Sequence, residues 1–191
     1  MRQISHGIVV TGGIGSGKSE AANYLRSRGF ALVDSDQISR EVFAAKTGEI
    51  VSFFGTTDRK KIGARIFADD WDRAKLEALL HPEIRAKVWA QCLDLDRAGK
   101  PFFVDIPLYF ENRADYGFLP RAILIYAPLE TRIARLVHYR KMSEEEVFER
   151  IDAQIPLEEK RSLATWIIEN DSTKDALRAE LNTFISTIAK P

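Results

Sequence analysis

The sequence has a single cysteine, no net charge and no long apolar run. Its 191 residues include 28 basic and 28 acidic side chains, which gives a formal net charge of zero. Cys92 alone forms neither an internal disulfide nor a multi-cysteine metal site. No apolar run approaches the roughly 20 residues of a transmembrane helix, and the N-terminus lacks the apolar core of a secretory signal. We therefore expect a cytoplasmic protein, a monomer or weak homo-oligomer, that binds neither membranes nor nucleic acid.

The length and composition predict one domain with an ordinary hydrophobic core. Apolar residues make up 45% of the chain, and a domain of this size buries roughly 70% of the surface that its unfolded chain exposes. Because the global charge is balanced, any site for an anion has to be built locally.

The most informative segment is glycine-rich and runs from Gly12 to Ser19. It fits the phosphate-binding loop (P-loop) pattern G-x-x-x-x-G-K-[ST]. The β-branched run 7–11 before it is typical of a buried strand, and residues 20–26 after it have a helical pattern that Gly29 ends. A chance match in this strand–loop–helix context is rare, so the segment predicts an ATP-binding site.

Each residue type in this loop has a physical reason. Glycines allow the backbone N–H groups to point inward at a phosphate, and the helix that follows adds the positive end of its dipole. Lys18 is expected to reach the β- and γ-phosphates, and the Ser19 hydroxyl to ligate Mg²⁺. The predicted nucleotide-binding residues in the loop are Gly13, Ile14, Gly15, Ser16, Gly17, Lys18, Ser19 and Glu20, the last through its backbone N–H.

Two aspartates follow the second predicted strand, residues 30–33. In extended backbone, residues two apart project to one side, so Asp34 and Asp36 are predicted to address one cleft at the carboxyl end of the sheet. Asp36 is the candidate catalytic or substrate-binding carboxylate; the alternative is that it caps the helix predicted over 37–45. Asp34 is assigned to capping or to a Mg²⁺-bound water.

The middle of the chain predicts helices. The basic cluster Arg59-Lys60-Lys61 with Arg65 is either a solvated face or an anion site. Asp70 is predicted to cap a helix over 71–80, which His81-Pro82 ends, with Pro82 in the first turn of the next helix. His81 is either structural or lines the cleft. A stripe at helical spacing that includes Cys92 predicts a core position for that cysteine rather than a nucleophile.

The remaining strands are predicted at 102–106, 121–126 and 165–168. Asp105 is a candidate for the second Mg²⁺-associated aspartate of P-loop proteins. Helices over 129–139 and from a capping box at Ser143 to about Ala153 enclose a short basic interval. That interval is either a solvated surface or a lid over the transferring phosphate, with basic candidates Arg132, Arg135, Arg140 and Lys141. Ser172 or Thr173 is predicted to cap the last helix.

Strands that alternate with helices predict an α/β fold with a parallel sheet of about five strands between two helical layers. The strand before the P-loop is expected at the centre of this three-layer α/β/α architecture, as in nucleoside-monophosphate kinases. The prediction is a single P-loop domain over residues 1–191.

A set of motifs, taken in order along the chain, resembles the dephospho-coenzyme A kinase family. These motifs are Thr11–Ser19, Asp34–Asp36 with Ser39–Val42, Arg59–Gly63 ahead of Phe67, Leu76-Glu77 before His81–Ile84, Pro107–Glu111 and Arg150–Gln154. They span nearly the whole chain, and their order is more specific than the P-loop alone.

The resemblance implies that the protein uses ATP to phosphorylate the ribose 3′-hydroxyl of dephospho-coenzyme A, the last step of coenzyme A biosynthesis. It implies a P-loop kinase domain with a helical substrate-binding insertion at about 37–98 and a lid at about 132–155. It further implies that Asp36 is the base, that Arg140 lies in the lid and that Asn170 lies near the adenine. The sequence departs from the family at Glu20, where threonine is usual, and at Tyr139, where a lid arginine is usual. Which of Arg135, Arg140 and Lys141 contacts phosphate is left open.

Other classes fit the sequence less well. Another small-molecule kinase of the same architecture is the nearest alternative, and the order of the motifs argues against it. A GTP-dependent switch normally carries an Asn-Lys-x-Asp element for guanine, and the sequence has none.

Overall fold

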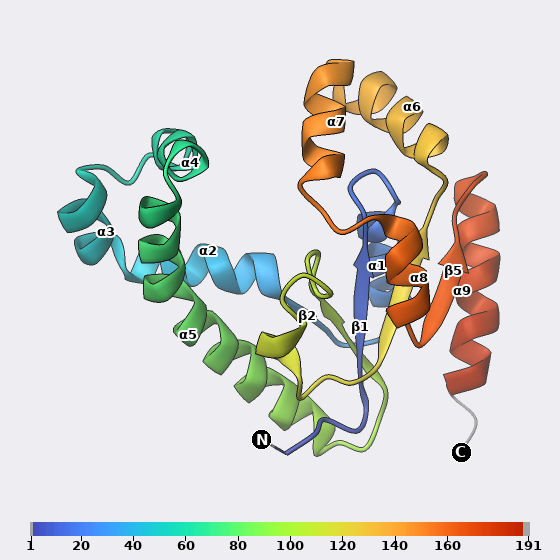
Figure 1. Cartoon of the computed structure of the whole chain (residues 1–191). Coiled ribbons are helices and arrows are strands. Elements are labelled where there is room, and N and C mark those ends of the chain that lie inside the picture. The colour runs from blue at the N-terminus through green and yellow to red at the C-terminus, as the bar shows by residue number, and fades with distance from the viewer. Residues whose placement is uncertain (1, 189–191) are drawn as a thin grey trace. The chain divides into compact units, whose positions relative to one another are not determined.

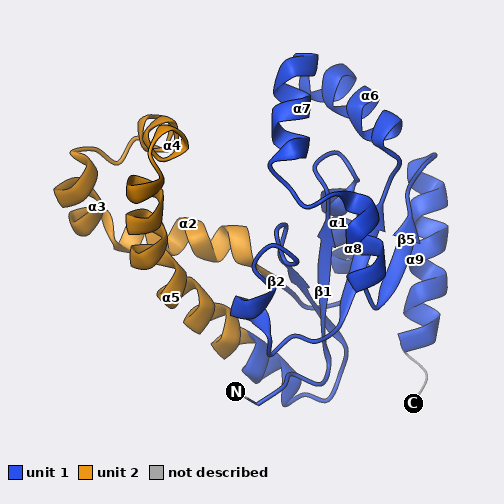
Figure 2. Ribbon diagram, viewed as in Figure 1, with its two compact units in different colours: residues 1–33, 92–191 blue, residues 34–91 orange. Residues whose placement is uncertain are grey.

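The computed structural model describes residues 2–188, which form two compact units. Unit 1 comprises residues 1–33 and 92–191, and unit 2 comprises residues 34–91 (Figure 2). Unit 1 contains the sheet, and unit 2 is helical. For comparison, the insertion predicted from the sequence spans about 37–98.

A five-stranded parallel sheet organises unit 1 (Figure 1). Its strands are β1 (Gly7–Gly12), β2 (Leu32–Asp34), β3 (Phe102–Asp105), β4 (Ala122–Tyr126) and β5 (Trp166–Glu169). Their order in the sheet is β2-β3-β1-β4-β5, so β1 is central, as the sequence predicted. β1 pairs in parallel with β3 and β4, and all six of its residues are buried.

Helices α1 (Lys18–Ser27) and α9 (Lys174–Ile188) cover one face of the sheet. Their apolar side chains join those of the strands in one core cluster, which includes Ile8, Val10, Ala21, Leu25, Phe103, Ile123, Ile125, Leu177, Leu181 and Phe184. Thr173 caps α9, because its Oγ1 accepts a hydrogen bond from the Ala176 N–H at 3.2 Å. The three-layer α/β/α fold predicted from the sequence is confirmed.

The other elements of unit 1 follow β3 and β4. A 3₁₀ turn, η1 (Arg113–Tyr116), lies between these strands, and Tyr109 donates its buried hydroxyl to the Leu119 carbonyl at 2.5 Å. After β4 come α6 (Leu129–Arg140), α7 (Glu144–Asp152) and α8 (Leu157–Leu163). The predicted capping box is present, since Ser143 and Glu146 exchange side-chain and backbone hydrogen bonds. Helix α8 has seven residues and was not predicted, because so short a segment shows too few turns for a periodic pattern.

Unit 2 consists of α2 (Ser35–Ala45), α3 (Thr47–Phe54), α4 (Arg59–Ala68) and most of α5 (Asp70–Asp96). All four helices contribute buried apolar side chains to it, which are Ile38, Val42, Ile50, Phe54, Ile62, Leu80, Ile84 and Val88. Asp58 caps α4 through hydrogen bonds from Lys60 and Lys61. In the basic cluster, Arg65 pairs with the buried Asp72 at 2.7 Å, whereas Arg59, Lys60 and Lys61 are exposed.

The structure corrects the prediction of a helix break at His81-Pro82. Helix α5 is continuous from Asp70 to Asp96 with Pro82 inside it. An interior proline costs a helix about 3 kcal/mol, but the buried stripe Leu80, Ile84, Val88 and Cys92 continues past it at four-residue spacing. Packing of this stripe outweighs the tendency of Pro82 to break the helix. The cap is also one residue earlier than predicted, because Asp69 accepts from the N–H groups of Trp71 and Asp72.

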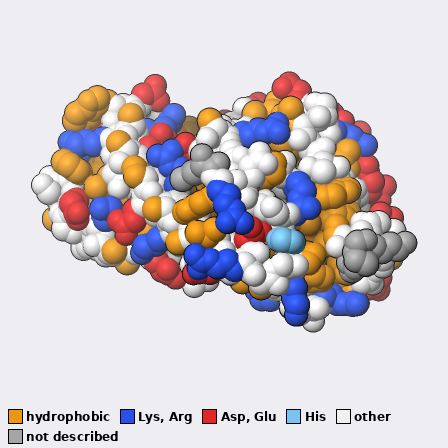
Figure 3. Space-filling view, turned by 90° about the horizontal axis from the view of Figure 1, so that it is seen from below, with side chains coloured by type: hydrophobic (Ala, Val, Ile, Leu, Met, Phe, Trp, Pro, Cys, Tyr) orange, Lys and Arg blue, Asp and Glu red, His pale blue; other side chains and the backbone are white. Residues whose placement is uncertain are grey.

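The surface agrees with the balanced composition. Figure 3 shows basic and acidic side chains interspersed over the face in view, without a region of one sign. None of the helices in residues 2–188 combines the length and the apolar character that spanning a bilayer requires.

A buried carboxylate joins the end of α5 to the residues before β1. Asp96 Oδ1 accepts from the N–H groups of Ser5 and His6, at 2.9 and 2.7 Å, and lies 3.0 Å from His6 Nδ1. Burial alone would raise the pKa of Asp96, but these hydrogen bonds and the nearby His6 lower it below its ordinary value.

We predict that Asp96→Ala lowers the free energy of unfolding at pH 7 by about 2 kcal/mol, because charge-assisted hydrogen bonds are lost. The pKa of Asp96 is lower in the folded than in the unfolded protein. Its contribution to the free energy of unfolding is therefore fully present above the unfolded pKa of about 3.9, and it disappears as the pH falls through the folded pKa. Urea titrations at pH 7 and at successively lower pH should show the wild type and variant converging. Asp94→Ala, which removes an exposed ion pair with Arg97, is the matched control. Equal effects of the two substitutions would contradict the prediction.

Candidate active site

The P-loop lies between the end of β1 at Gly12 and the start of α1 at Lys18. Gly15 and Gly17 have positive φ angles of 80° and 94°, which side chains rarely tolerate. The N-cap of α1 is Gly17, and no side chain in the described part of the chain caps this helix. The first N–H groups of α1 therefore have no capping side chain to bind, which is the arrangement of an anion site at a helix N-terminus.

Lys18 is held at the carboxyl end of β3. Its ammonium group forms an ion pair with Asp105, and each side chain is 14% exposed. The Thr11 hydroxyl donates to the Pro107 carbonyl at 3.0 Å, which fixes the segment after β3 against β1. The lysine and the candidate Mg²⁺-associated aspartate predicted from the sequence are thus in contact.

Asn170, just after β5, supports the P-loop from the side. Its side chain is buried, and Nδ2 donates to the Ser16 carbonyl at 2.7 Å. A Cβ on Gly17 would lie 2.1 Å from this nitrogen. The close approach of Asn170 is therefore a second reason for glycine at position 17.

Arg135 of α6 reaches the same region. Its Nη2 donates to Asn170 Oδ1 at 3.4 Å and to the Ser172 carbonyl at 3.3 Å. Its Nη1 is buried without a hydrogen-bond partner among residues 2–188 and lies 4.0 Å from the position of a Cβ on Gly17. A buried guanidinium nitrogen with unused donors beside the P-loop is suited to an anionic ligand.

Glu20 points away from the loop. Its carboxylate pairs with Lys174 at 3.3 Å and with Arg178 at 3.1 Å, both on α9. The Glu20 side chain therefore links α1 to α9. Only its backbone N–H, in the first turn of α1, is placed with the phosphate-binding groups of the loop.

Two side chains of the predicted lid, those of Arg132 and Gln154, contact the tip of the P-loop. Arg132 donates from Nε to the Ile14 carbonyl at 2.9 Å, and Gln154 accepts from the Ile14 N–H at 3.0 Å. The contacts themselves were not predicted from the sequence, because they join positions more than a hundred residues apart.

Comparisons with known proteins decide between the kinase families that share this loop. The family model for dephospho-CoA kinase matches residues 7–176. A dephospho-CoA kinase of Wolinella succinogenes is 39% identical, over 100% of this chain and 98% of its own. The chain belongs to the dephospho-CoA kinase family.

Solved structures agree with this membership in the family. TT1252 from Thermus thermophilus superimposes with a TM-score of 0.84 at 35% identity, over 100% of both chains. Dephospho-CoA kinase from Campylobacter jejuni has a TM-score of 0.71 at 31% identity, over 97% of this chain and 98% of its own. A shikimate kinase from Acinetobacter baumannii, at 18% identity and a TM-score of 0.53, shares the P-loop kinase fold and covers 96% of this chain and 95% of its own.

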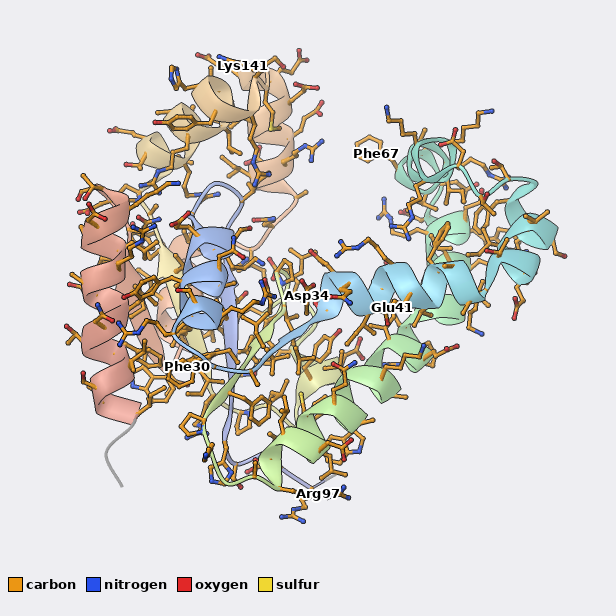
Figure 4. All side chains as sticks on the ribbon, turned by 180° about the vertical axis from the view of Figure 1, so that it is seen from behind. Phe30, Asp34, Glu41, Phe67, Arg97 and Lys141 are labelled. Carbon is orange, nitrogen blue, oxygen red and sulfur yellow. The ribbon has the colours of Figure 1, made fainter. Side chains whose placement is uncertain are left out.

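Within unit 2, the structure separates the roles of the two aspartates. Asp34, labelled in Figure 4, lies just before α2 and caps it, accepting from the Gln37 N–H at 2.8 Å. Asp36 lies in the first turn of α2 with an exposed side chain. The alternative that Asp36 caps the helix is therefore wrong, because Asp34 performs that task. His81, within α5, is half-buried.

The basic candidates of the predicted lid differ in position. Arg135 contacts the residues beside the P-loop, whereas Arg140 is exposed at the last position of α6. Lys141 follows with a φ of 56° and is exposed at the turn between α6 and α7 (Figure 4). Tyr139, where the resemblance led us to expect an arginine, is 77% exposed.

We predict that Gly17→Ala weakens ATP binding about tenfold or more, because the new Cβ displaces Asn170 and strains the loop amides. The strained backbone should also lower the free energy of unfolding by about 1–3 kcal/mol. Titration calorimetry with ATP and urea unfolding measure the two effects.

Gly29→Ala is the matched control for this substitution. Gly29 also has a positive φ, of 87°, but no atom of the described residues lies within 4 Å of its Cβ position. It should therefore destabilise the fold without changing ATP affinity. Unchanged ATP affinity in the Gly17 variant would show that the approach of Asn170 does not matter.

Proposed function

We propose that this enzyme transfers the γ-phosphoryl group of ATP to the ribose 3′-hydroxyl of dephospho-coenzyme A, giving coenzyme A and ADP in the cytoplasm. The observation that carries the proposal is a well-formed P-loop in a chain that matches the dephospho-CoA kinase family over residues 7–176. The family match supports the substrate, and the loop geometry supports the cosubstrate.

The phosphates of ATP would bind at the N-terminus of α1. The groups that we assign to them are the Lys18 ammonium and the N–H groups of the loop residues from Gly13 to Glu20. Two of these N–H groups, those of Ile14 and Ser16, donate within the protein in this structure, to Gln154 and to the Gly13 carbonyl. The transition state spreads negative charge over the transferred group, so positioning and positive charge supply most of the catalysis. We assign Lys18 to this role, and Asn170 to the region of the adenine.

The donor set fits a magnesium ion that is bound together with ATP. Within residues 2–188, no group of three or more His, Cys, Asp or Glu side chains could hold a metal alone. Magnesium usually keeps several waters and binds through one or two protein groups plus the substrate phosphates. Ser19 is exposed at the second position of α1, and Asp105 lies at the end of β3. These two residues would hold the ion, which would neutralise charge on the β- and γ-phosphates.

Asp36 would orient the attacking hydroxyl and accept its proton. The bond from the 3′-oxygen to phosphorus forms as the bond from phosphorus to the leaving ADP oxygen breaks, and the hydroxyl proton passes to the carboxylate. Asp36 follows β2 by two residues, and in open α/β sheets ligands bind outside the carboxyl ends of the strands. Because Asp34 provides the cap, the Asp36 carboxylate has no capping duty.

The α6–α7 segment would act as the lid. Arg140, with Lys141 beside it, would meet the transferring phosphate when this segment closes, and closure would exclude water that could otherwise accept the phosphoryl group. Arg135, already beside the P-loop, would contact the bound nucleotide.

The proposal is tested by a coupled ADP-release assay with ATP and Mg²⁺. Dephospho-coenzyme A is compared with AMP, CMP, adenosine and shikimate as acceptors. We expect ADP release with dephospho-coenzyme A alone. Turnover only on another acceptor would reject the proposed substrate and keep the kinase, and tight ATP binding without any acceptor-dependent turnover would reject the kinase activity.

Asp36→Asn is predicted to reduce kcat by about 10²–10⁴ because it removes the proton acceptor. ATP affinity should be nearly unchanged, since the P-loop is intact. Steady-state kinetics and ATP titration separate the two effects, with Asp34→Asn, at the helix cap, as the comparison. An unchanged kcat in the Asp36 variant would exclude that residue from the mechanism.

Arg140→Ala is predicted to lower kcat by about 10³ or more if its guanidinium stabilises the transferring phosphoryl group. Arg135→Ala and Lys141→Ala are assayed in parallel. A loss below tenfold at Arg140, with a large loss at either neighbour, would transfer the role to that neighbour.

A further inference from the structure

The peptide groups on either side of Ile14, at the tip of the P-loop, are held from both ends of the α6–α7 segment. The Ile14 carbonyl accepts from Arg132 Nε at 2.9 Å, in the first turn of α6. The Ile14 N–H donates to Gln154 Oε1 at 3.0 Å, two residues after α7 ends. Both hydrogen-bonding groups of one loop residue are thus bound by the two ends of the predicted lid.

The contact with Arg132 is close and buried. Its side chain is 4% exposed, and burial lowers the pKa of its guanidinium. A Cβ on Gly13 would lie 3.1 Å from Arg132 Cζ, and one on Gly15 would lie 3.0 Å from the Arg132 carbonyl oxygen. The glycines on either side of Ile14 therefore allow α6 to pack directly on the loop.

The other end of the segment is anchored as well. The Ile155 N–H, next to Gln154, donates to Glu111 Oε1 at 3.2 Å. The same oxygen pairs at 2.6 Å with Lys160, whose side chain is fully buried in α8. Breaking a buried ion pair by removing one partner is costly. The pair of Glu111 with Lys160 therefore fixes the backbone at Ile155, and with it the position of the neighbouring Gln154.

We propose that Arg132 and Gln154 are positioning residues for phosphoryl transfer: they hold Ile14 in place, and through it the phosphate-binding N–H groups of the P-loop. A loop with glycine at four of its six residues from 12 to 17 has little stiffness of its own. N–H groups that are aimed before the ligand arrives need no reorganisation at the moment of reaction. The same two contacts tie the position of the α6–α7 segment to the loop that carries ATP.

This inference rests on the proposed function only in taking ATP as the ligand of the loop. The test therefore uses binding, which requires no acceptor. Affinities of Arg132→Met, Gln154→Leu and the double variant are measured for three probes: ATP with Mg²⁺, inorganic tripolyphosphate, and adenosine, which has no phosphate. Calorimetry serves the first two probes, and ligand-observed NMR serves adenosine.

Each single variant is expected to bind ATP and tripolyphosphate about tenfold more weakly, because each loses one hydrogen bond to Ile14 of the loop. Adenosine affinity should stay the same, because only the phosphate-binding groups lose their support. Since both residues hold Ile14, the double variant should be no more than about threefold weaker than the weaker single variant.

Two matched controls come from the surface. Arg97→Met removes an exposed arginine, seen in Figure 4 pointing away from the end of α5, and Gln3→Leu removes an exposed glutamine. Neither should change any of the three affinities. Gln154 is half-buried and uncharged, so its variant keeps the test valid if Arg132→Met fails to fold.

Three results would overturn the proposal. The first is ATP affinity within twofold of the wild type in both single variants. The second is an equal loss for adenosine, which indicates a general structural defect. The third is a double variant whose loss is the product of the two single losses, which indicates that the residues act independently.

Discussion

The structure depends on holding a glycine-rich loop in one conformation at the N-terminus of α1. Glycine permits the required conformation, with φ of 80° at Gly15 and 94° at Gly17, but provides no side chain to fix it. The fold supplies the missing contacts. The central strand β1 fixes the start of the loop and α1 its end, and Asn170 supports its side through the Ser16 carbonyl.

The same constraint explains how a chain without net charge builds an anion site. Positive charge is concentrated locally, at Lys18, at Arg135 and at the start of α1. Lys18 is balanced by Asp105 in this structure. Because the formal net charge of the whole chain is zero, this local positive charge is a property of the site rather than of the whole molecule.

Much of the fold followed from local patterns. The central place of β1, the capping box at Ser143 and the P-loop were predicted because short-range sequence patterns determine each of them. The prediction of a helix break at Pro82 was wrong, because packing of the stripe from Leu80 to Cys92 outweighs the local effect of a proline. Either aspartate was a plausible cap for α2, and only the backbone geometry showed that it is Asp34.

The contacts that support the site were less accessible from the sequence. Arg132 was counted among the basic residues of a lid, and nothing local distinguishes it from Arg135 or Arg140. Its role at Ile14 depends on how α6 packs on Gly13 and Gly15, which is a long-range property of the fold. The roles of Asp36, Arg140 and Asn170 toward substrates remain predictions.

The central claim is transfer of a phosphoryl group to one hydroxyl of one acceptor, and the identity of the product tests it most directly. ATP, Mg²⁺ and dephospho-coenzyme A are incubated with the enzyme, and the product is analysed by phosphorus and proton NMR. We expect a new phosphate monoester whose phosphorus couples to the ribose 3′ proton. Coupling to the 2′ proton, a lengthened pyrophosphate chain, or recovery of unchanged dephospho-coenzyme A would contradict it.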